Sequence, residues 1–350
     1  MRDAGIRSAL VAAVLAIVPA GCGLLDPDDE AAPEQILFIA GGASAQDVYR
    51  MNADGTGLVN LTRAPDRYRS LDITSDGRTV IFHREIDCHI WTMTPGGSDQ
   101  KSLGASCGRL PRLSPDGRLV AYENERAIHV MNIDGTGSRD VSQDLPPVEP
   151  SPCGQTPNWH VWPFGWVSTS RVAFRRGICG VGTTFYSVNA DGTGLVEIDF
   201  NPQSAHLSPD ATQIAFDRAD DLSTTPAVMI MNVDGSNRRV IAAGGALPDR
   251  FLYSHSPWSP NGRRLYYAHV DGHHIADVQT GVLQRMAAPS TDAEFLGWSR
   301  GGDRLLFRVH ERDQNGSVVS TDLQVVNADG TGLVNLTRNA SFETEATWIP

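Results

Sequence analysis

The sequence predicts an all-β protein: a single seven-bladed β-propeller of four-stranded antiparallel blades, whose ring is closed by the C-terminal strand. Three observations lead to this fold class. One turn motif recurs seven times, a second turn motif alternates with it six times, and a short apolar run follows each copy of the second. The 34 glycines and 21 prolines among 350 residues also favour many short elements joined by turns.

Residues 1–21 have the pattern of a lipoprotein signal peptide. Two arginines precede an apolar run at 9–18, which is too short to span a bilayer. Residues 19–22 (PAGC) resemble a bacterial lipobox, with proline where leucine is usual. The resemblance implies cleavage before Cys22 and a lipid on its thiol. The alternative is an ordinary secreted chain with a cysteine near its start.

Residues 22–35 are predicted to form an acidic tether between the lipid and the folded domain at 36–350, because they lack any apolar periodicity. Gly23 follows the cysteine, and by analogy with bacterial lipoproteins this favours the outer membrane. We therefore expect a lipid-anchored protein of the bacterial cell envelope, held at the outer membrane through Cys22 and facing the periplasm or the cell surface.

The charge of the chain excludes one class of partner. The formal net charge is −12, and a chain this acidic is repelled by phosphate backbones. We therefore expect that the protein does not bind nucleic acid. We also expect a monomer.

Two turn motifs define the repeat. The first is NxDGTG or a variant of it, at 52–57, 94–99, 132–137, 189–194, 232–237, 277–282 and 327–332. The second is SPDGR or a variant of it, at 74–78, 114–118, 167–171, 208–212, 259–263 and 299–303. Asp-Gly and Pro-Asp-Gly are strong hairpin signals. Each repeat is thus predicted to be four strands, a to d, with SPDG between a and b and NxDG between c and d.

The two ends of the domain complement each other. The chain enters at 36–39 with a b-type strand and leaves at 346–349 with an a-type strand. Pairing of these strands would close the ring and remove its free edges. Seven blades are expected, while six or eight would follow if a degenerate copy at 167–171 or 277–282 were misassigned.

The repeat resembles the TolB-type, WD40-like propeller repeat. The resemblance is clearest at 48–62, 113–137 and 324–337, and it extends over 36–350. It implies the propeller fold and leaves function open, because such propellers serve as scaffolds, sensors and accessory domains.

The longer connections predict the binding face. In this topology the tight turns share one face, and the b–c and d–a connections share the other, which we call the loop face. Those connections are expected at 84–88, 104–110, 141–162, 175–182, 217–226, 244–257 and 308–321. Irregular loops on a rigid scaffold commonly carry binding sites. The leading hypothesis is a non-catalytic scaffold that binds an envelope protein or a glycan through the loop face, with no cofactor and no catalytic residue.

Four cysteines fall in loop-face connections. An even number in an exported chain suggests disulfides, and we pair Cys88 with Cys107 and Cys153 with Cys179. Two other pairings are possible. A thiol metal or redox site is the alternative, although no CxxC spacing is present.

Aromatic residues cluster just before the fourth blade. Trp159, His160 and Trp162 are predicted to form a binding surface on a loop, because clustered aromatics can stack on a sugar or anchor a protein partner. The alternative is that Trp162 and Trp166 are inward residues of the strand that opens this blade.

Histidines around the sixth blade support a second hypothesis. His255, His269, Asp271 and His273 could hold a divalent metal ion, with His274 beside them. Some oligogalacturonate lyases, which resemble this repeat type, bind a metal through histidines on a propeller face. The alternative function is therefore a metal-assisted polysaccharide lyase, so enzyme activity stays open.

Overall fold

The computed structural model describes most of the unit Glu34–Pro350. The described residues are 33–42, 45–104, 107–147, 159–178, 182–200, 204–219, 226–247, 256–290, 292–338 and 341–350. The predictions for residues 1–21, Cys22, most of the tether, Cys153, Cys179 and His255 lie outside these ranges. Within them, no helix has the length and apolar character needed to cross a membrane.

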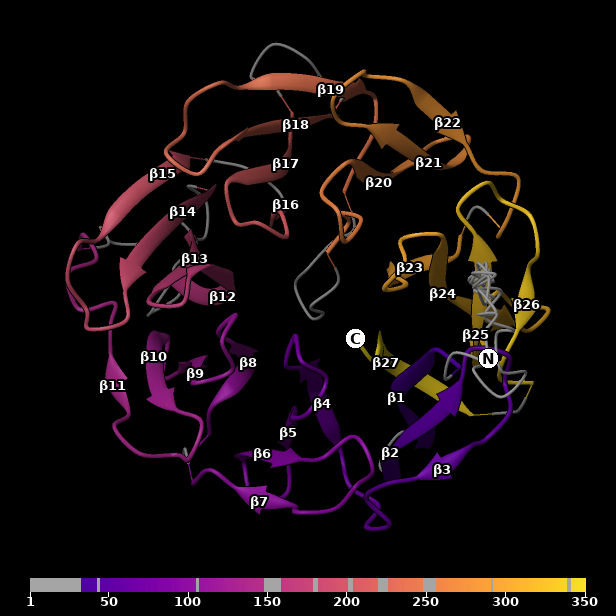
Figure 1. The fold of residues 1–350 in the computed structure, drawn as a ribbon, viewed down its shortest axis with the longest axis horizontal. Coiled ribbons are helices and arrows are strands. Elements are labelled where there is room, and N and C mark those ends of the chain that lie inside the picture. Colours follow the sequence, from indigo (N-terminus) through magenta and orange to yellow (C-terminus); the bar gives the residue numbers. More distant parts are fainter. Residues whose placement is uncertain are drawn as a thin grey trace, which may run out of the picture. The chain divides into compact units, whose positions relative to one another are not determined.

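Seven antiparallel sheets are arranged around a common centre in chain order, which confirms the predicted propeller (Figure 1). The strands of each blade are given from the innermost outward. Blade 1 contains β27 (Phe342–Trp348), β1 (Gln35–Gly42), β2 (Ala45–Asn52) and β3 (Val59–Asn60), and blade 2 contains β4 (Tyr68–Ile73), β5 (Val80–Arg84), β6 (His89–Met93) and β7 (Lys101–Ser102). Blade 3 contains β8 (Arg109–Leu113), β9 (Leu119–Asn124), β10 (Ala127–Asn132) and β11 (Arg139–Asp140), and blade 4 contains β12 (Trp159–Ser168), β13 (Arg171–Ile178), β14 (Gly182–Asn189) and β15 (Val196–Phe200). Blade 5 contains β16 (Ser204–Leu207), β17 (Gln213–Ala219), β18 (Pro226–Asn232) and β19 (Arg239–Ala243). Blade 6 contains β20 (Arg264–His269), β21 (Gly272–Asp277) and β22 (Leu283–Arg285), and blade 7 contains β23 (Glu294–Trp298), β24 (Arg304–Arg312), β25 (Val318–Asn327) and β26 (Val334–Asn335).

Blade 6 differs from the others at its inner edge. Its sheet contains three strands, and the position of the a strand is marked by an isolated bridge between Trp258 and Leu265. Six blades are therefore four-stranded, as predicted. In the described part of the sixth, two isolated bridges, Trp258 with Leu265 and Ala246 with Ala268, lie along the inner edge of β20.

The a–b turns form as the SPDG motif predicts. In blade 3 the Gly117 amide donates to the Ser114 carbonyl over 2.8 Å, and the Ser114 hydroxyl donates to Asp116 over 2.7 Å. Gly117 has φ +68°, a value that glycine adopts without strain. The motif thus encodes the turn through both side chain and backbone.

The c–d turns also contact the neighbouring blade. In blade 3 the Thr136 amide donates to Asp134 over 2.9 Å, and the Asn132 side chain donates to the Thr136 hydroxyl over the same distance. A Cβ atom on Gly135 would lie 2.4 Å from the Leu103 carbonyl oxygen of blade 2. Glycine is therefore required here for close packing as well as for its φ of +91°.

The core lies between adjacent blades. The middle strands are apolar on both faces because each sheet is covered on both sides: Ile81 of blade 2 and Val120 of blade 3, for example, are fully buried in one cluster. Neighbouring blades are also joined by indole hydrogen bonds at the inner strands. Their donor–acceptor pairs are Trp166 with the Arg112 carbonyl, Trp258 with that of His206, Trp298 with that of Pro257 and Trp348 with that of Gly297.

The ring closes as predicted. β27 pairs with β1 in antiparallel register, with Ile36 opposite Trp348. β27 also contacts the next blade, because Glu345 accepts hydrogen bonds from two backbone amides of β4. The first and last strands of the domain therefore belong to one sheet.

Two of the predicted loops are largely strand. β13 and β14 pair through the region 175–182, and β24 and β25 pair through much of 308–321. The prediction of irregular loops there was wrong, because cross-strand pairing continues past the apolar runs: Arg175 faces Phe185, and His310 faces Thr321.

Candidate functional site

A cavity of about 540 Å³ opens on the loop face. Its walls come from blades 1 to 4, at the ends of the a and b strands nearest the b–c and d–a connections. The lining residues are Arg69, Ser70, His83, Glu85, Cys88, Arg109, Leu110, Glu123, His160, Val161, Trp162 and Glu345. The volume falls within the range typical of ligand sites, roughly 300–1,000 Å³.

A disulfide borders the cavity. Cys88, in the b–c connection of blade 2, is bonded to Cys107, in the connection that leads into blade 3. The Cys107 amide also donates to the Cys88 carbonyl over 2.6 Å. This predicted pairing is confirmed, and it ties two segments of the loop face together.

The structure separates the three predicted binding residues. His160 and Trp162 line the cavity, whereas Trp159 packs against the apolar cluster between blades 3 and 4. The prediction of a loop was wrong at this point: all three belong to β12, where successive side chains point to opposite faces. Trp166, further along the same strand, is buried, as the alternative for this cluster expected.

Trp162 is packed rather than open. The Arg175 guanidinium lies 5.0 Å from the centre of its indole, and the His160 ring lies 5.7 Å from it. A Cβ atom on Gly177 would lie 3.0 Å from the indole, so glycine makes room for the ring. Trp162 thus supports His160, which is exposed and is the aromatic group available to a partner.

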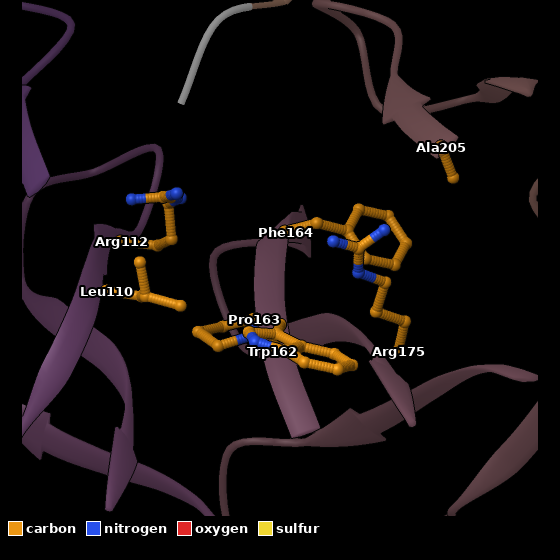
Figure 2. Close-up of a pocket in the computed structure, with 7 residues that line it drawn as sticks. All are labelled: Leu110, Arg112, Trp162, Pro163, Phe164, Arg175 and Ala205. Atoms are coloured by element: carbon orange, nitrogen blue, oxygen red, sulfur yellow. The ribbon is translucent and has the colours of Figure 1, made fainter. Parts of the chain in front are cut away.

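Figure 2 shows the inner side of this wall, where Trp162 and Arg175 lie across a small cavity from Leu110 and Arg112. Arg112 is buried and donates to the Pro111 carbonyl over 2.9 Å. Burial lowers the pKa of Arg112, while Asp72 and Glu345 partly offset that effect. The inner strands therefore carry buried charge behind the loop-face cavity.

The cavity wall alternates between acidic and basic groups. Arg69 donates to Glu85 over 2.8 Å, and Arg109 lies opposite Glu123 across the β8–β9 pair. His83 is buried, and its Nε2 atom has no hydrogen-bond partner. Burial lowers the pKa of His83, because the charged imidazolium is poorly solvated there. A neutral acceptor or donor is thus left unpaired in the wall.

Glu345 occupies a bulge in the neighbouring blade. β4 is irregular between Arg69 and Asp72, with Ser70 at φ +58°, and this frees two amides. The amides of Ser70 and Leu71 donate to the Glu345 carboxylate over 2.7 and 2.6 Å. Burial raises the pKa of Glu345 to about 7 in spite of these bonds.

Sequence reasoning did not identify the charged wall. Arg69, Glu85, Arg109 and Glu123 have no motif of their own, and only their places at strand ends bring them together. The signal that was available is positional: each lies at the loop-face end of an a or b strand.

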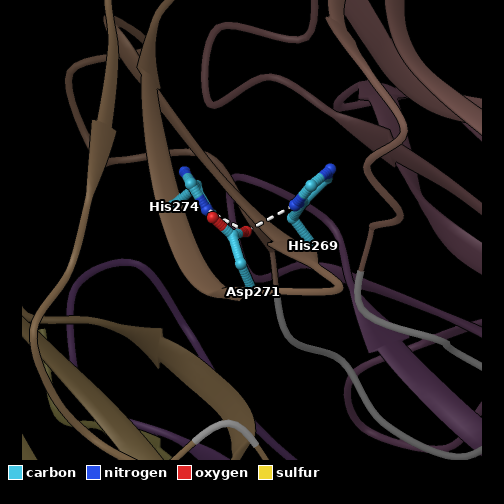
Figure 3. A group of neighbouring side chains, drawn as sticks. All are labelled: His269, Asp271 and His274. Carbon is cyan, nitrogen blue, oxygen red and sulfur yellow. Dashed lines mark hydrogen bonds and ion pairs between the residues drawn. The ribbon is translucent and has the colours of Figure 1, made fainter.

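A second group lies on the b–c hairpin of blade 6, apart from the residues that line the cavity. Figure 3 shows His269, Asp271 and His274 turned toward one another, and their ligand atoms all lie within 4.8 Å. His274 donates to the Asp271 carboxylate over 2.9 Å, and His269 contacts the same oxygen.

The predicted metal set is wrong at His273. This ring is buried, and both of its nitrogens are engaged, one with the Tyr266 hydroxyl over 2.7 Å and one with the Ser290 carbonyl over 2.8 Å. Strand alternation places the neighbouring His274 beside Asp271 instead.

Comparison with known proteins supports the fold. No protein-family model matches the chain, and no curated protein matches it in sequence. Among solved structures it is similar to TolB from Acinetobacter baumannii, with 15% identity and a TM-score of 0.53, over 91% of this chain and 67% of that one. In fold, the chain is a TolB-type propeller.

Some solved structures with a similar fold are enzymes. An oligogalacturonate lyase in complex with manganese matches with 14% identity and a TM-score of 0.59, over 88% of this chain and 85% of that one. A puromycin-hydrolyzing peptidase from Mycobacterium tuberculosis matches with 14% identity and a TM-score of 0.56, over 87% of this chain and 53% of the peptidase. At such identities the likeness concerns the fold alone.

Proposed function

We propose that this TolB-type propeller is a non-catalytic scaffold of the bacterial cell envelope that binds a protein or glycan partner through its loop face. The observation that carries the proposal is the cavity of about 540 Å³, whose wall includes His160 and Trp162. Rigid strands hold the wall in place, so the site is formed before a partner arrives.

The chemistry of the wall favours a polar partner. Pockets for small organic molecules are mostly apolar, with few polar groups. Here most lining side chains are charged or carry an imidazole, and Arg69 and Arg109 lie near acidic groups. A peptide segment or a sugar offers the matching donors and acceptors, with His160 as a stacking surface.

The envelope location rests on the lipobox-like residues 19–22 and on the fold shared with TolB. We propose that Cys22 carries the lipid and that the protein is held at the outer membrane. Replacing Cys22 with Ser should move the protein from the membrane to the soluble fraction. Unchanged partitioning would contradict the anchor.

The binding proposal is tested with the full chain immobilised and exposed to envelope extract and to a glycan array. The parent should retain one dominant protein or glycan, and His160→Ala should lose it. His310→Ala is the matched control, because His310 lies in blade 7 and does not line the cavity. Equal retention by both variants would place the contact elsewhere, and no retention by the parent would argue against a scaffold.

A metal-assisted lyase is the second candidate. The His269, Asp271 and His274 group and the fold likeness to the manganese-bound oligogalacturonate lyase favour it. The distribution of the groups weighs against it, because the large cavity is lined by blades 1 to 4 and the histidines lie in blade 6. Incubation with oligogalacturonate and manganese, followed by ultraviolet absorbance of unsaturated products, would reveal this activity.

A further inference from the structure

We propose that His269, Asp271 and His274 form a binding site for one divalent transition-metal ion of the zinc class on the loop face of blade 6. The site is separate from the partner-binding cavity, and it requires no lyase activity. Its evidence is the geometry of one short hairpin.

The hairpin places all three side chains on one side of the sheet. In the β20–β21 pair, His269 lies opposite Gly272 and Tyr267 lies opposite His274. His269 and His274 are therefore diagonal neighbours on the same face, which is within reach of long side chains. Gly272 carries no side chain opposite His269, so the Asp271 carboxylate can lie between the two rings, as Figure 3 shows.

The ligand atoms already converge. Nδ1 of His269 and Nε2 of His274 both contact Oδ1 of Asp271. Neighbouring ligands on a tetrahedral ion with bonds of about 2 Å lie roughly 3.3 Å apart. The three atoms here lie within 4.8 Å of one another, so small side-chain rotations would accommodate an ion. The ion would then take the place of the protons that the two rings now share with the carboxylate.

A second layer of contacts holds these ligands. The carboxylate of Asp271 is divided: Oδ1 faces the imidazoles, and Oδ2 lies 3.6 Å from Nε of Arg285. Arg285 also donates to the Asp271 carbonyl over 3.0 and 2.6 Å, which fixes the hairpin tip. The His274 ring stacks on Tyr267 with centres 5.2 Å apart. Outer partners of this kind orient metal ligands and favour binding.

The ligand set and its exposure indicate the kind of ion. Two imidazoles and one carboxylate suit zinc, nickel or copper, whereas magnesium, calcium and manganese prefer oxygen ligands. The side chains of His269, Asp271 and His274 are 30%, 49% and 13% exposed. Three protein ligands with an open side leave a coordination position for water or for a group of a bound partner.

The test is calorimetric titration of the full chain, purified without a polyhistidine tag and stripped with a chelator, against zinc chloride. One ion should bind per chain. Changing a residue that contacts a metal ligand costs roughly 10- to 100-fold in metal affinity, and Arg285→Gln should weaken zinc binding by such a factor. His269→Gln and His274→Gln each remove a ligand, and each should weaken zinc binding by at least as much. Cobalt substitution should give the visible spectrum of a four-coordinate ion.

His310→Gln is the matched control and should bind zinc like the parent. Thermal melting in chelator shows whether each variant is folded, and Asp271→Asn serves as a further variant if a histidine variant is not. Absence of stoichiometric zinc binding would overturn the proposal. Zinc binding that survives both histidine substitutions would overturn it as well. Because the partner capture uses His160, failure of one experiment does not decide the other.

Discussion

Single tryptophans at the inner strands join one blade to the next. The indole of Trp258 is buried, and it donates to the His206 carbonyl over 3.0 Å. The same position is tryptophan in blades 1, 4 and 7, where the indole also reaches the preceding inner strand. The residue therefore does more than fill space, since it satisfies a buried carbonyl of another blade.

Replacing Trp258 with Phe should lower the free energy of unfolding by about 1–3 kcal/mol, because the His206 carbonyl would lose its donor. Urea unfolding followed by circular dichroism measures this change. Trp91→Phe is the control: its indole binds Asp87 at a half-buried site, and a smaller loss is expected. Equal losses of unfolding free energy in the two variants would show that the hydrogen bond between blades stabilises the fold no more than the half-buried bond within one blade.

Glu345 should make stability depend on pH. Burial raises its pKa to about 7 in the folded protein, above the ordinary value of 4.5. Its protonated form is therefore favoured by folding, so this contribution is fully present below about pH 4.5 and is lost as the pH rises through 7. Relative to Glu345→Gln, the parent should lose about 3 kcal/mol over that interval.

Unfolding free energies at several pH values measure the difference between the parent and Glu345→Gln. Arg69 and Arg112 lower the pKa of Glu345, and both arginines are present in the two proteins, so that only residue 345 differs between them. Parallel pH curves would show that Glu345 is already ionised at pH 5.

Sequence reasoning succeeded at residues fixed by the repeat and failed where strand direction decides. The alternative that Trp166 is an inward residue of its strand was readable, and Trp166 is buried. The sequence did not show which of two adjacent residues faces a site. His274 rather than His273 contacts Asp271, and Trp159 points away from the cavity. Side chains alternate along a strand, so a shift of one position reverses the answer.

At the scale of elements, the Cys88–Cys107 bond joins the b–c connection of blade 2 to the segment entering blade 3. The two cysteines are 19 positions apart, and a loop of that size is worth about 3 kcal/mol in the chain-entropy model. Cys88 also lines the cavity. The bond thus stabilises the fold and holds one wall of the proposed site.

The Cys88→Ser, Cys107→Ser double variant should unfold at lower urea concentration, with a loss of about 3 kcal/mol. Its affinity for the captured partner should fall too. Adding reductant to the parent should reproduce both effects, and the double variant should respond less to reductant, because only the predicted Cys153–Cys179 bond is left to reduce there. A parent indifferent to reductant would contradict a structural role for the bond.

Strand ends, rather than motifs, build the cavity. The turn motifs predicted every hairpin on the opposite face, because Asp-Gly and Pro-Asp-Gly act within a few residues. The loop face has no repeated sequence, and its wall combines residues from four blades. Only the assembled ring brings those ends together, so the site could be assigned to a face from sequence but not to its residues.

At the scale of the whole molecule, one strand closes the ring. β27 pairs with β1 and contacts β23 and β4 on either side. Without it, β1 would expose an unpaired edge, and edges of this kind promote aggregation.

Ending the chain before Ser341 should therefore make the protein aggregate. Gel filtration should show aggregates, and circular dichroism should show lost sheet content. A synthetic peptide of residues 341–350, added during refolding, should restore a soluble propeller by pairing with β1. A truncated protein that stays monomeric and cooperative would show that six blades and a partial first blade suffice.

The pairing of Ile36 with Trp348 also sets the order of events during folding. The partners are separated by about 310 positions, so closing this loop costs more conformational entropy than pairing strands that are neighbours in sequence. β1 can pair early with β2, which follows it directly, and the strands of the other blades are also close in sequence. The other edge of β1 is covered only when β27 is in place, so that edge needs protection from unpaired strands until then.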